Sequence, residues 1–75
     1  MFIDIRSAEK YLLGHVNGAI NINYYDLMLH PSNYLKKGVV YNIYCDTGYR
    51  SEIVVSKLKK LGYDCVNAGR YDNYL

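Results

Sequence analysis

The sequence predicts an α/β fold, a small parallel β-sheet of about four strands with helices on both faces. Three observations support this prediction. Segments typical of strands recur along the chain, a segment with helical spacing follows most of them, and 75 residues suffice for one hydrophobic core. Alternating strands and helices favour parallel strands joined by right-handed crossovers. We therefore expect a single domain over residues 1–75.

The first half of the chain contains two predicted strands and two helical segments. Residues 2–6 (FIDIR) alternate as a strand does, and residues 7–14 (SAEKYLLG) have the pattern of a short helix that Gly14 ends. Residues 18–22 (GAINI) form a second short strand. Residues 24–38 hold one or two helical turns, because a proline interrupts the segment and a glycine closes it.

The second half contains the clearest elements. Residues 38–45 (GVVYNIYC) form a continuous apolar run rich in β-branched residues, which is typical of a central parallel strand. Residues 50–62 (RSEIVVSKLKKLG) form the strongest predicted helix, and residues 64–69 (DCVNAG) form the last strand. The helix residues predicted to face the sheet recur at i, i+4 and i+7: Val54, Leu58 and Leu61.

Composition and charge exclude several classes of function. The formal net charge of +2 is small and the basic residues are dispersed, so nucleic acid is not an expected partner. No stretch approaches the ~20 apolar residues of a membrane span, and the first residues lack the pattern of a secretion signal. We expect a cytoplasmic protein whose two cysteines are free thiols, with no membrane partner.

The segment YCDTGYRS, residues 44–51, combines residue types that can hold an anion. Cys45 closes the predicted central strand, where parallel sheets bind their ligands, and a helix begins directly after it. Unpaired backbone N–H groups at a helix start favour a thiolate. Lowering a thiol pKa from ~8.5 by about two units corresponds to roughly 2.7 kcal/mol. The predicted cradle comprises Asp46, Thr47, Gly48, Tyr49, Arg50 and Ser51. Judged from this segment alone, an inert core cysteine followed by an ordinary turn is the favoured interpretation, and the position of Cys45 at the end of the central strand strengthens the catalytic one.

Three quoted segments resemble the rhodanese domain: DIRSAEKYLLGHVNGAINI, YCDTGYRS and LGYDCVNAGR. They are similar to that family's Asp-x-Arg strand, its Gly-His-Ile-x-Gly-Ala-x-Asn-Ile segment and its Cys-x-x-Gly-x-Arg-Ser loop. The last segment is similar to the Gly-Tyr that precedes the family's Gly-Gly-x-x-x-Trp ending. The resemblance covers nearly the whole chain, in the family's order and spacing. It implies the rhodanese fold.

The resemblance also implies sulfurtransferase chemistry. Cys45 would attack the outer sulfur of an anionic donor such as thiosulfate, release sulfite and hold the sulfur as a persulfide. A thiol, including a protein thiol, or cyanide would then accept it. Arg50 would hold the donor or the leaving group, and the backbone from Asp46 to Arg50 would steady the persulfide. No cofactor and no metal is implied.

Two alternatives remain at this stage. Cysteine phosphatases and arsenate reductases use a loop one residue longer, whereas here Arg50 follows Cys45 after four residues. The other alternative is a rhodanese-like binding or regulatory module with weak catalysis. Three departures favour it: the chain starts directly at the Asp-x-Arg strand, which predicts an exposed sheet edge, Arg70 replaces a family glycine, and Tyr74 replaces a tryptophan.

Several residues outside the loop receive supporting or structural roles. Asp4 and Arg6 lie near the same sheet edge as Cys45, where they either anchor loops or add positive potential. His15 is expected to anchor a loop. Cys65 opens a strand whereas Cys45 closes its neighbour, so the two thiols are too far apart for a disulfide. The carboxylate of Asp46 opposes thiolate formation and thiosulfate binding if it faces the sulfur.

Overall fold

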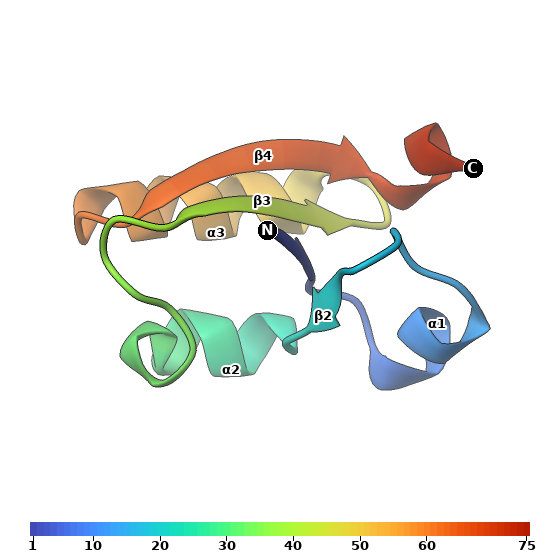
Figure 1. Cartoon of the computed structure of the whole chain (residues 1–75), viewed down its shortest axis with the longest axis horizontal. Helices are drawn as coiled ribbons and strands as arrows, with labels where there is room; N and C mark the ends of the chain where they lie inside the picture. The colour runs from blue at the N-terminus through green and yellow to red at the C-terminus, as the bar shows by residue number, and fades with distance from the viewer.

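A four-stranded parallel sheet forms the centre of the molecule in the computed structural model, which describes all 75 residues. The strands are β1 (Phe2–Asp4), β2 (Ile20–Asn21), β3 (Val40–Cys45) and β4 (Asp64–Arg70). Their spatial order is β2-β1-β3-β4, and every neighbouring pair is parallel (Figure 1). This confirms the predicted fold class and places the apolar run of β3 inside the sheet.

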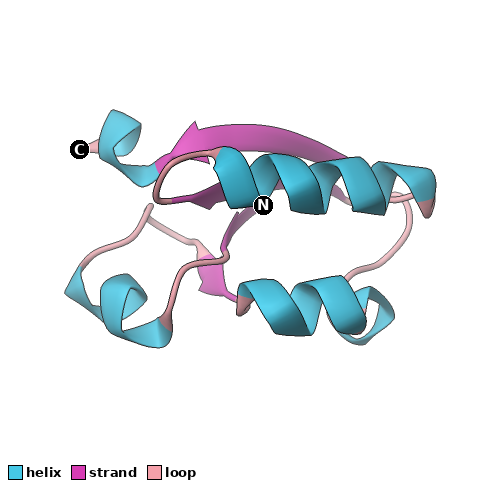
Figure 2. Ribbon diagram, turned by 180° about the vertical axis from the view of Figure 1, so that it is seen from behind, coloured by secondary structure: helices cyan, strands magenta, loops and turns pink.

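Helical segments connect the strands and cover the sheet. They are α1 (Ala8–Leu13), α2 (Tyr24–Leu29) with a following 3-10 turn (Pro31–Asn33), α3 (Tyr49–Lys60) and a C-terminal 3-10 turn (Tyr71–Tyr74). The helices α2 and α3 contact each other and lie on the same face of the sheet. Figure 2 shows this face toward the viewer. No helix is both long and apolar enough to cross a membrane.

The main core lies between the sheet and the α2–α3 layer. Alternate strand residues point into it, because successive side chains of a strand point to opposite faces. From the sheet these include Ile3, Ile43 and Cys45, and from the helices they include Leu27, Val54 and Leu58, all at most 4% exposed. A second, aromatic layer covers the other face, where Phe2 and Tyr44 pack against the C-terminal turn.

One core prediction for α3 is wrong. Leu61 is 46% exposed, and Val55 is buried in its place beside Val54 and Leu58. The helix ends at Lys60, so Leu61 is already its C-cap and turns away from the sheet. The buried stripe of α3 therefore comprises Val54, Val55 and Leu58, with Val55 in place of the predicted Leu61.

The carboxyl ends of three strands meet at one edge of the sheet. Asp4 pairs with Tyr44 in the register of β1 and β3, and Cys45 pairs with Arg70 in that of β3 and β4. Segments from distant parts of the sequence thus converge on Cys45. At the sides of the sheet, β2 and β4 are the outer strands, and four of the seven residues of β4 are exposed.

Candidate active site

The Cys45 sulfur lies inside a ring of donors at the start of α3. Cys45 ends β3 and is 4% exposed. Its Sγ accepts the backbone N–H of Gly48 at 3.1 Å and that of Ser51 at 3.4 Å. These N–H groups have no partner within the helix, because the first turn of any helix leaves its donors free. The amino-terminal end of α3 therefore points its positive dipole end at the sulfur.

The loop reaches this shape because of one glycine and one threonine. Gly48 caps α3 with φ of +83°, a left-handed conformation that side-chain-bearing residues rarely adopt. Thr47 Oγ1 accepts the N–H of Tyr49 at 3.3 Å, and the Gly48 carbonyl accepts that of Glu52, the first bond of the helix. The turn is thus fixed on both sides of Gly48, so its N–H faces the sulfur.

Opposing effects set the pKa of the Cys45 thiol. Burial raises the pKa, whereas the Ser51 hydroxyl and the N–H groups of Ser51, Gly48 and Thr47 lower it, and the result is a pKa below the ordinary value. Burial raises the pKa of Cys65, which has no such donors. The two thiols thus differ in the direction that separates a reactive cysteine from an inert one.

A pocket of about 440 Å³ opens over the sulfur. Three basic side chains and one carboxylate contribute to its wall, together with Tyr49, an exposed residue in the first turn of α3. The charged residues are Arg6, Lys10, Asp46 and Arg50. Arg6 pairs with a carboxylate and Lys10 pairs with another, so Arg50 is the basic residue of the pocket without an acidic partner. An anion entering the pocket would therefore meet Arg50 as its available cation.

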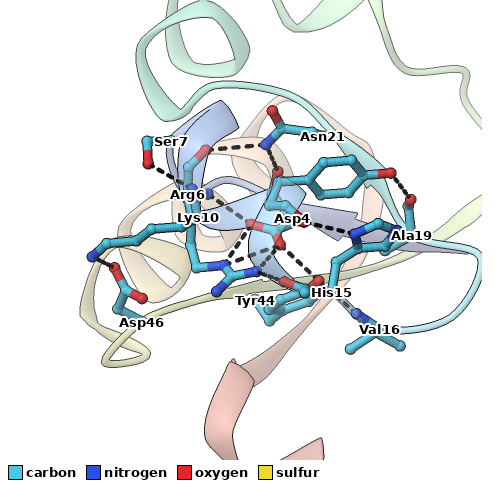
Figure 3. Close-up of polar contacts among 12 residues, drawn as sticks. Asp4, Arg6, Ser7, Lys10, His15, Val16, Ala19, Asn21, Tyr44 and Asp46 are labelled. Atoms are coloured by element: carbon cyan, nitrogen blue, oxygen red, sulfur yellow. Dashed lines mark hydrogen bonds and ion pairs between the residues drawn. The ribbon is translucent and has the colours of Figure 1, made fainter.

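Asp46 points to Lys10 at the rim of the pocket. Lys10 Nζ lies 2.5 Å from Asp46 Oδ2, and both side chains are about half exposed (Figure 3). The ion pair joins α1 to the loop that carries Cys45. It also neutralises much of the negative charge that the sequence analysis placed beside the sulfur.

Arg50 lies against two aromatic rings of α2. Its Cζ is 4.8 Å from the centroid of the Tyr24 ring and 5.4 Å from that of Tyr25. The guanidinium also lies 3.4 Å from the Tyr25 hydroxyl. These contacts hold an otherwise mobile side chain at the pocket wall. They leave most of its N–H donors free.

Asp4 and Arg6 form a buried pair that supports the site from behind (Figure 3). Asp4 accepts bonds from the Arg6 guanidinium, the shortest at 2.6 Å, and from the Tyr44 hydroxyl at 2.8 Å. Arg6 also donates to the Gly14 carbonyl at 2.7 Å, which anchors the end of α1. Burial and the bond to Asp4 raise the pKa of Tyr44 to about 12. The geometry corresponds to the loop-anchoring role considered for the pair, although Arg6 also lines the pocket.

The remaining predicted positions lie away from the sulfur. His15 Nδ1 contacts the Tyr11 carbonyl at 2.8 Å and its ring stacks on that of Tyr11 at 3.7 Å, as a loop anchor would. Cys65 pairs with Tyr41, four residues before Cys45 on β3, which separates the thiols by roughly 13 Å along the strands. This separation excludes a disulfide, as the sequence predicted, and both cysteines are free.

Four residues of the site were not predicted from the sequence. Lys10 lies 36 residues before its partner Asp46, and Tyr24 and Tyr25 belong to a segment with no motif. Asn67, on β4, bonds to the Ser51 hydroxyl from 16 residues away. Side chains alternate along β4, so Asn67 lies on the same face of the sheet as Cys65. This alternation is the sequence signal that could have predicted that Asn67 faces α3.

Comparison with known proteins agrees with this geometry. The family model of the rhodanese-like domain matches residues 1–73. The structure of SSP1007 from Staphylococcus saprophyticus subsp. saprophyticus is similar with a TM-score of 0.87 and 28% identity, over 99% of this chain and 74% of that one. A rhodanese-like domain protein from Staphylococcus aureus gives a TM-score of 0.82 and 30% identity, over 96% of this chain and 70% of that one. No curated protein matches the chain. The fold, the cysteine loop and these matches together show that the chain belongs to the rhodanese-like domain family.

Proposed function

We propose that this chain is a sulfurtransferase that carries sulfane sulfur as a persulfide on Cys45. The observation that carries the proposal is the position of the Cys45 sulfur, which accepts two backbone N–H groups at the start of α3 below a pocket lined by Arg50. Such a site stabilises a thiolate and attracts an anion. Thiosulfate or a small persulfide is the proposed donor, and a thiol or cyanide is the proposed acceptor.

The proposed reaction needs no redox partner and no general base. The Cys45 thiolate attacks the outer sulfur of thiosulfate, so a bond forms between Sγ and that sulfur while the S–S bond of thiosulfate breaks. Sulfite leaves with the electron pair of that bond. Cyanide or a thiolate then attacks the bound sulfur, departs as thiocyanate or a persulfide, and restores the Cys45 thiolate.

Different residues have distinct proposed roles in this reaction. Gly48 and Ser51 donate their N–H groups to the sulfur, and Arg50 binds the negatively charged end of the donor. Asp46 and Lys10 form an ion pair at the rim, so together they add little net charge to the electrostatic potential there. Thr47 and Tyr49 shape the turn and the pocket wall.

Intact mass tests the proposal directly. After incubation with thiosulfate and removal of excess reagent, wild type and Cys65→Ser should gain the mass of one sulfur atom, whereas Cys45→Ala should not. Cyanide should then remove the added mass and release thiocyanate. Absence of any gain with thiosulfate and with a small persulfide donor would refute sulfur transfer.

A catalytically weak binding or regulatory module of the same family is the second candidate. The altered ending of the chain favours it, because Arg70, paired with Asp72, replaces a family glycine and Tyr74 replaces a tryptophan. The same experiment separates the two candidates. A module would leave Cys45 unmodified by either donor, and its Cys45→Ser variant would behave as wild type in every binding assay.

A further inference from the structure

The Ser51 hydroxyl lies between the Cys45 sulfur and a side chain of β4. Ser51 is fully buried, and its Oγ is 3.5 Å from Cys45 Sγ and 2.6 Å from Asn67 Oδ1. It also lies 3.0 Å from the Gly48 carbonyl. The hydroxyl has one proton to donate and several acceptors within reach.

Backbone contacts fix which atom of Asn67 faces Ser51. Oδ1 accepts the N–H of Gly69 at 2.9 Å, and Nδ2 approaches the Gly48 carbonyl at 3.3 Å. If the amide were flipped, Asn67 Nδ2 would face the Gly69 N–H, so two donors would meet. Oδ1 would face the Gly48 carbonyl, so two acceptors would meet. The amide oxygen therefore faces Ser51, and an amide oxygen only accepts. It follows that Ser51 donates its proton along the 2.6 Å contact.

Two orientations of the hydroxyl matter for ionisation of the thiol, one toward Asn67 Oδ1 and one toward the sulfur. While Cys45 is a thiol, its S–H donates to Ser51 Oγ and the Ser51 proton stays on Asn67. Once the thiol proton has left to solvent through the pocket, the sulfur can only accept. The hydroxyl must then rotate its proton away from Asn67 Oδ1 to reach the thiolate. Asn67 Oδ1 loses one bond but keeps the Gly69 N–H.

We propose that Asn67 is a positioning residue, which competes with the Cys45 thiolate for the Ser51 hydroxyl proton and so restrains ionisation of the thiol. The inference concerns the nucleophile of the proposed sulfur transfer and rests on that function for its biological meaning. Its physical content is separate, because it describes an equilibrium of the free protein.

Other groups around the sulfur act on the same ionisation. Arg6, Lys10, Asp46 and Arg50 face the pocket, and the start of α3 contributes N–H donors. Burial raises the pKa of Cys45, and the bond to the Ser51 hydroxyl is the leading contact that lowers it. Of these groups only Gly48 contacts the Asn67 side chain, because its carbonyl accepts from Asn67 Nδ2 at 3.3 Å. An effect of Asn67 that passes through Ser51 vanishes when the hydroxyl is removed, whereas one that passes through Gly48 persists.

The pH dependence of alkylation tests the inference. The rate of iodoacetamide addition to Cys45, followed by mass spectrometry of its peptide, gives the apparent pKa in Asn67→Ala, Ser51→Ala and the double variant. Asn67→Ala should lower the pKa, with about three- to tenfold faster alkylation at pH values well below it. Val66→Ala, an exposed neighbour on the opposite face of β4, should leave the rate unchanged. In the Ser51→Ala background, Asn67→Ala should have no effect.

Two outcomes would overturn the inference. One is an unchanged or raised pKa in Asn67→Ala, as loosening of the loop would produce. The other is an equal decrease with and without the Ser51 hydroxyl. If Asn67→Ala does not fold, Asn67→Asp provides a second test, because it keeps the acceptor. It should raise the pKa of Cys45, and the rise should be smaller in the Ser51→Ala background. A rise of the same size with and without the Ser51 hydroxyl would contradict the inference. The readout needs no sulfur donor, so failure here and failure to load Cys45 with sulfur are separate results.

Discussion

Replacing Asp4 with alanine should remove a large part of the stability of the protein. Asp4 is fully buried and accepts bonds from the Arg6 backbone N–H at 2.9 Å, the Arg6 guanidinium and the Tyr44 hydroxyl. Without it, a guanidinium that is only 5% exposed has no counter-charge. Breaking a buried pair on one side costs about 3–5 kcal/mol. A chain of 75 residues has a free energy of unfolding of roughly 4–11 kcal/mol, so Asp4→Ala should lose between about a quarter and all of it at 25 °C.

Urea denaturation followed by circular dichroism measures this loss. The double variant Asp4→Leu/Arg6→Leu should recover most of the stability, because it leaves no unpaired charge. Arg70 and Asp72 provide the matched control. They have the same spacing in sequence and form two bonds, of 3.0 and 2.8 Å, but both side chains are about half exposed. The free energy of unfolding of Asp72→Ala should therefore be close to that of wild type.

The reasoning fails if burial does not decide the outcome. An Asp4→Ala variant as stable as Asp72→Ala would mean that water or a rearranged Arg6 compensates the lost carboxylate. Additive losses in the double variant would show that the two side chains are not coupled, and the pair would then have no role as a unit.

Three further predictions concern ionisation and the pocket rim. Because the pKa of Cys45 is lowered and that of Cys65 is raised, iodoacetamide at pH 7 should alkylate Cys45 at least about tenfold faster, and similar rates would contradict the assignment. Tyr44 keeps its proton up to about pH 12 in the folded state, so the free energy of unfolding should fall as pH rises from about 10 to 12, by at most about 1.4 kcal/mol per pH unit. Tyr44→Phe should lack this fall in urea titrations. For the proposed transfer, the KM for thiosulfate is measured in an assay of thiocyanate formation. Asp46→Asn should lower this KM about two- to fivefold, and Lys10→Gln should raise it by a similar factor. KM values equal to that of wild type would exclude a role for the rim pair.

Local patterns in the sequence were sufficient to predict the fold. The apolar run of β3, the helical spacing of α3 and the glycines after α1 and α3 each act within a few residues. The exposed Leu61 shows where such reasoning stops. The apolar stripe of α3 is broad, and both the end of the helix and its rotation over the sheet decide which member is buried. That rotation depends on packing against α2, which no local pattern encodes.

The site divides along the same line. Cys45, Gly48 and Arg50 could be predicted because a contiguous loop and a helix start define their surroundings. Lys10 and Asn67 could not, since both reach the loop through the tertiary fold, from 36 and 16 residues away in sequence. Sequence reasoning thus identified the loop that holds the sulfur of the proposed chemistry, but not the side chains that reach this loop only through the tertiary fold.

The depth of the Cys45 sulfur has a consequence for any molecule that reacts with it. Cys45 ends a strand that is hydrogen-bonded to neighbours on both sides, and only 4% of the residue is accessible. A thiol held this way cannot swing outward to meet a second molecule. Each reagent must extend a slender reactive end down to the sulfur, so width near the attacking atom becomes a criterion of selection. Small ions and thiols on protruding tips satisfy that criterion, whereas thiols flanked by bulky groups do not.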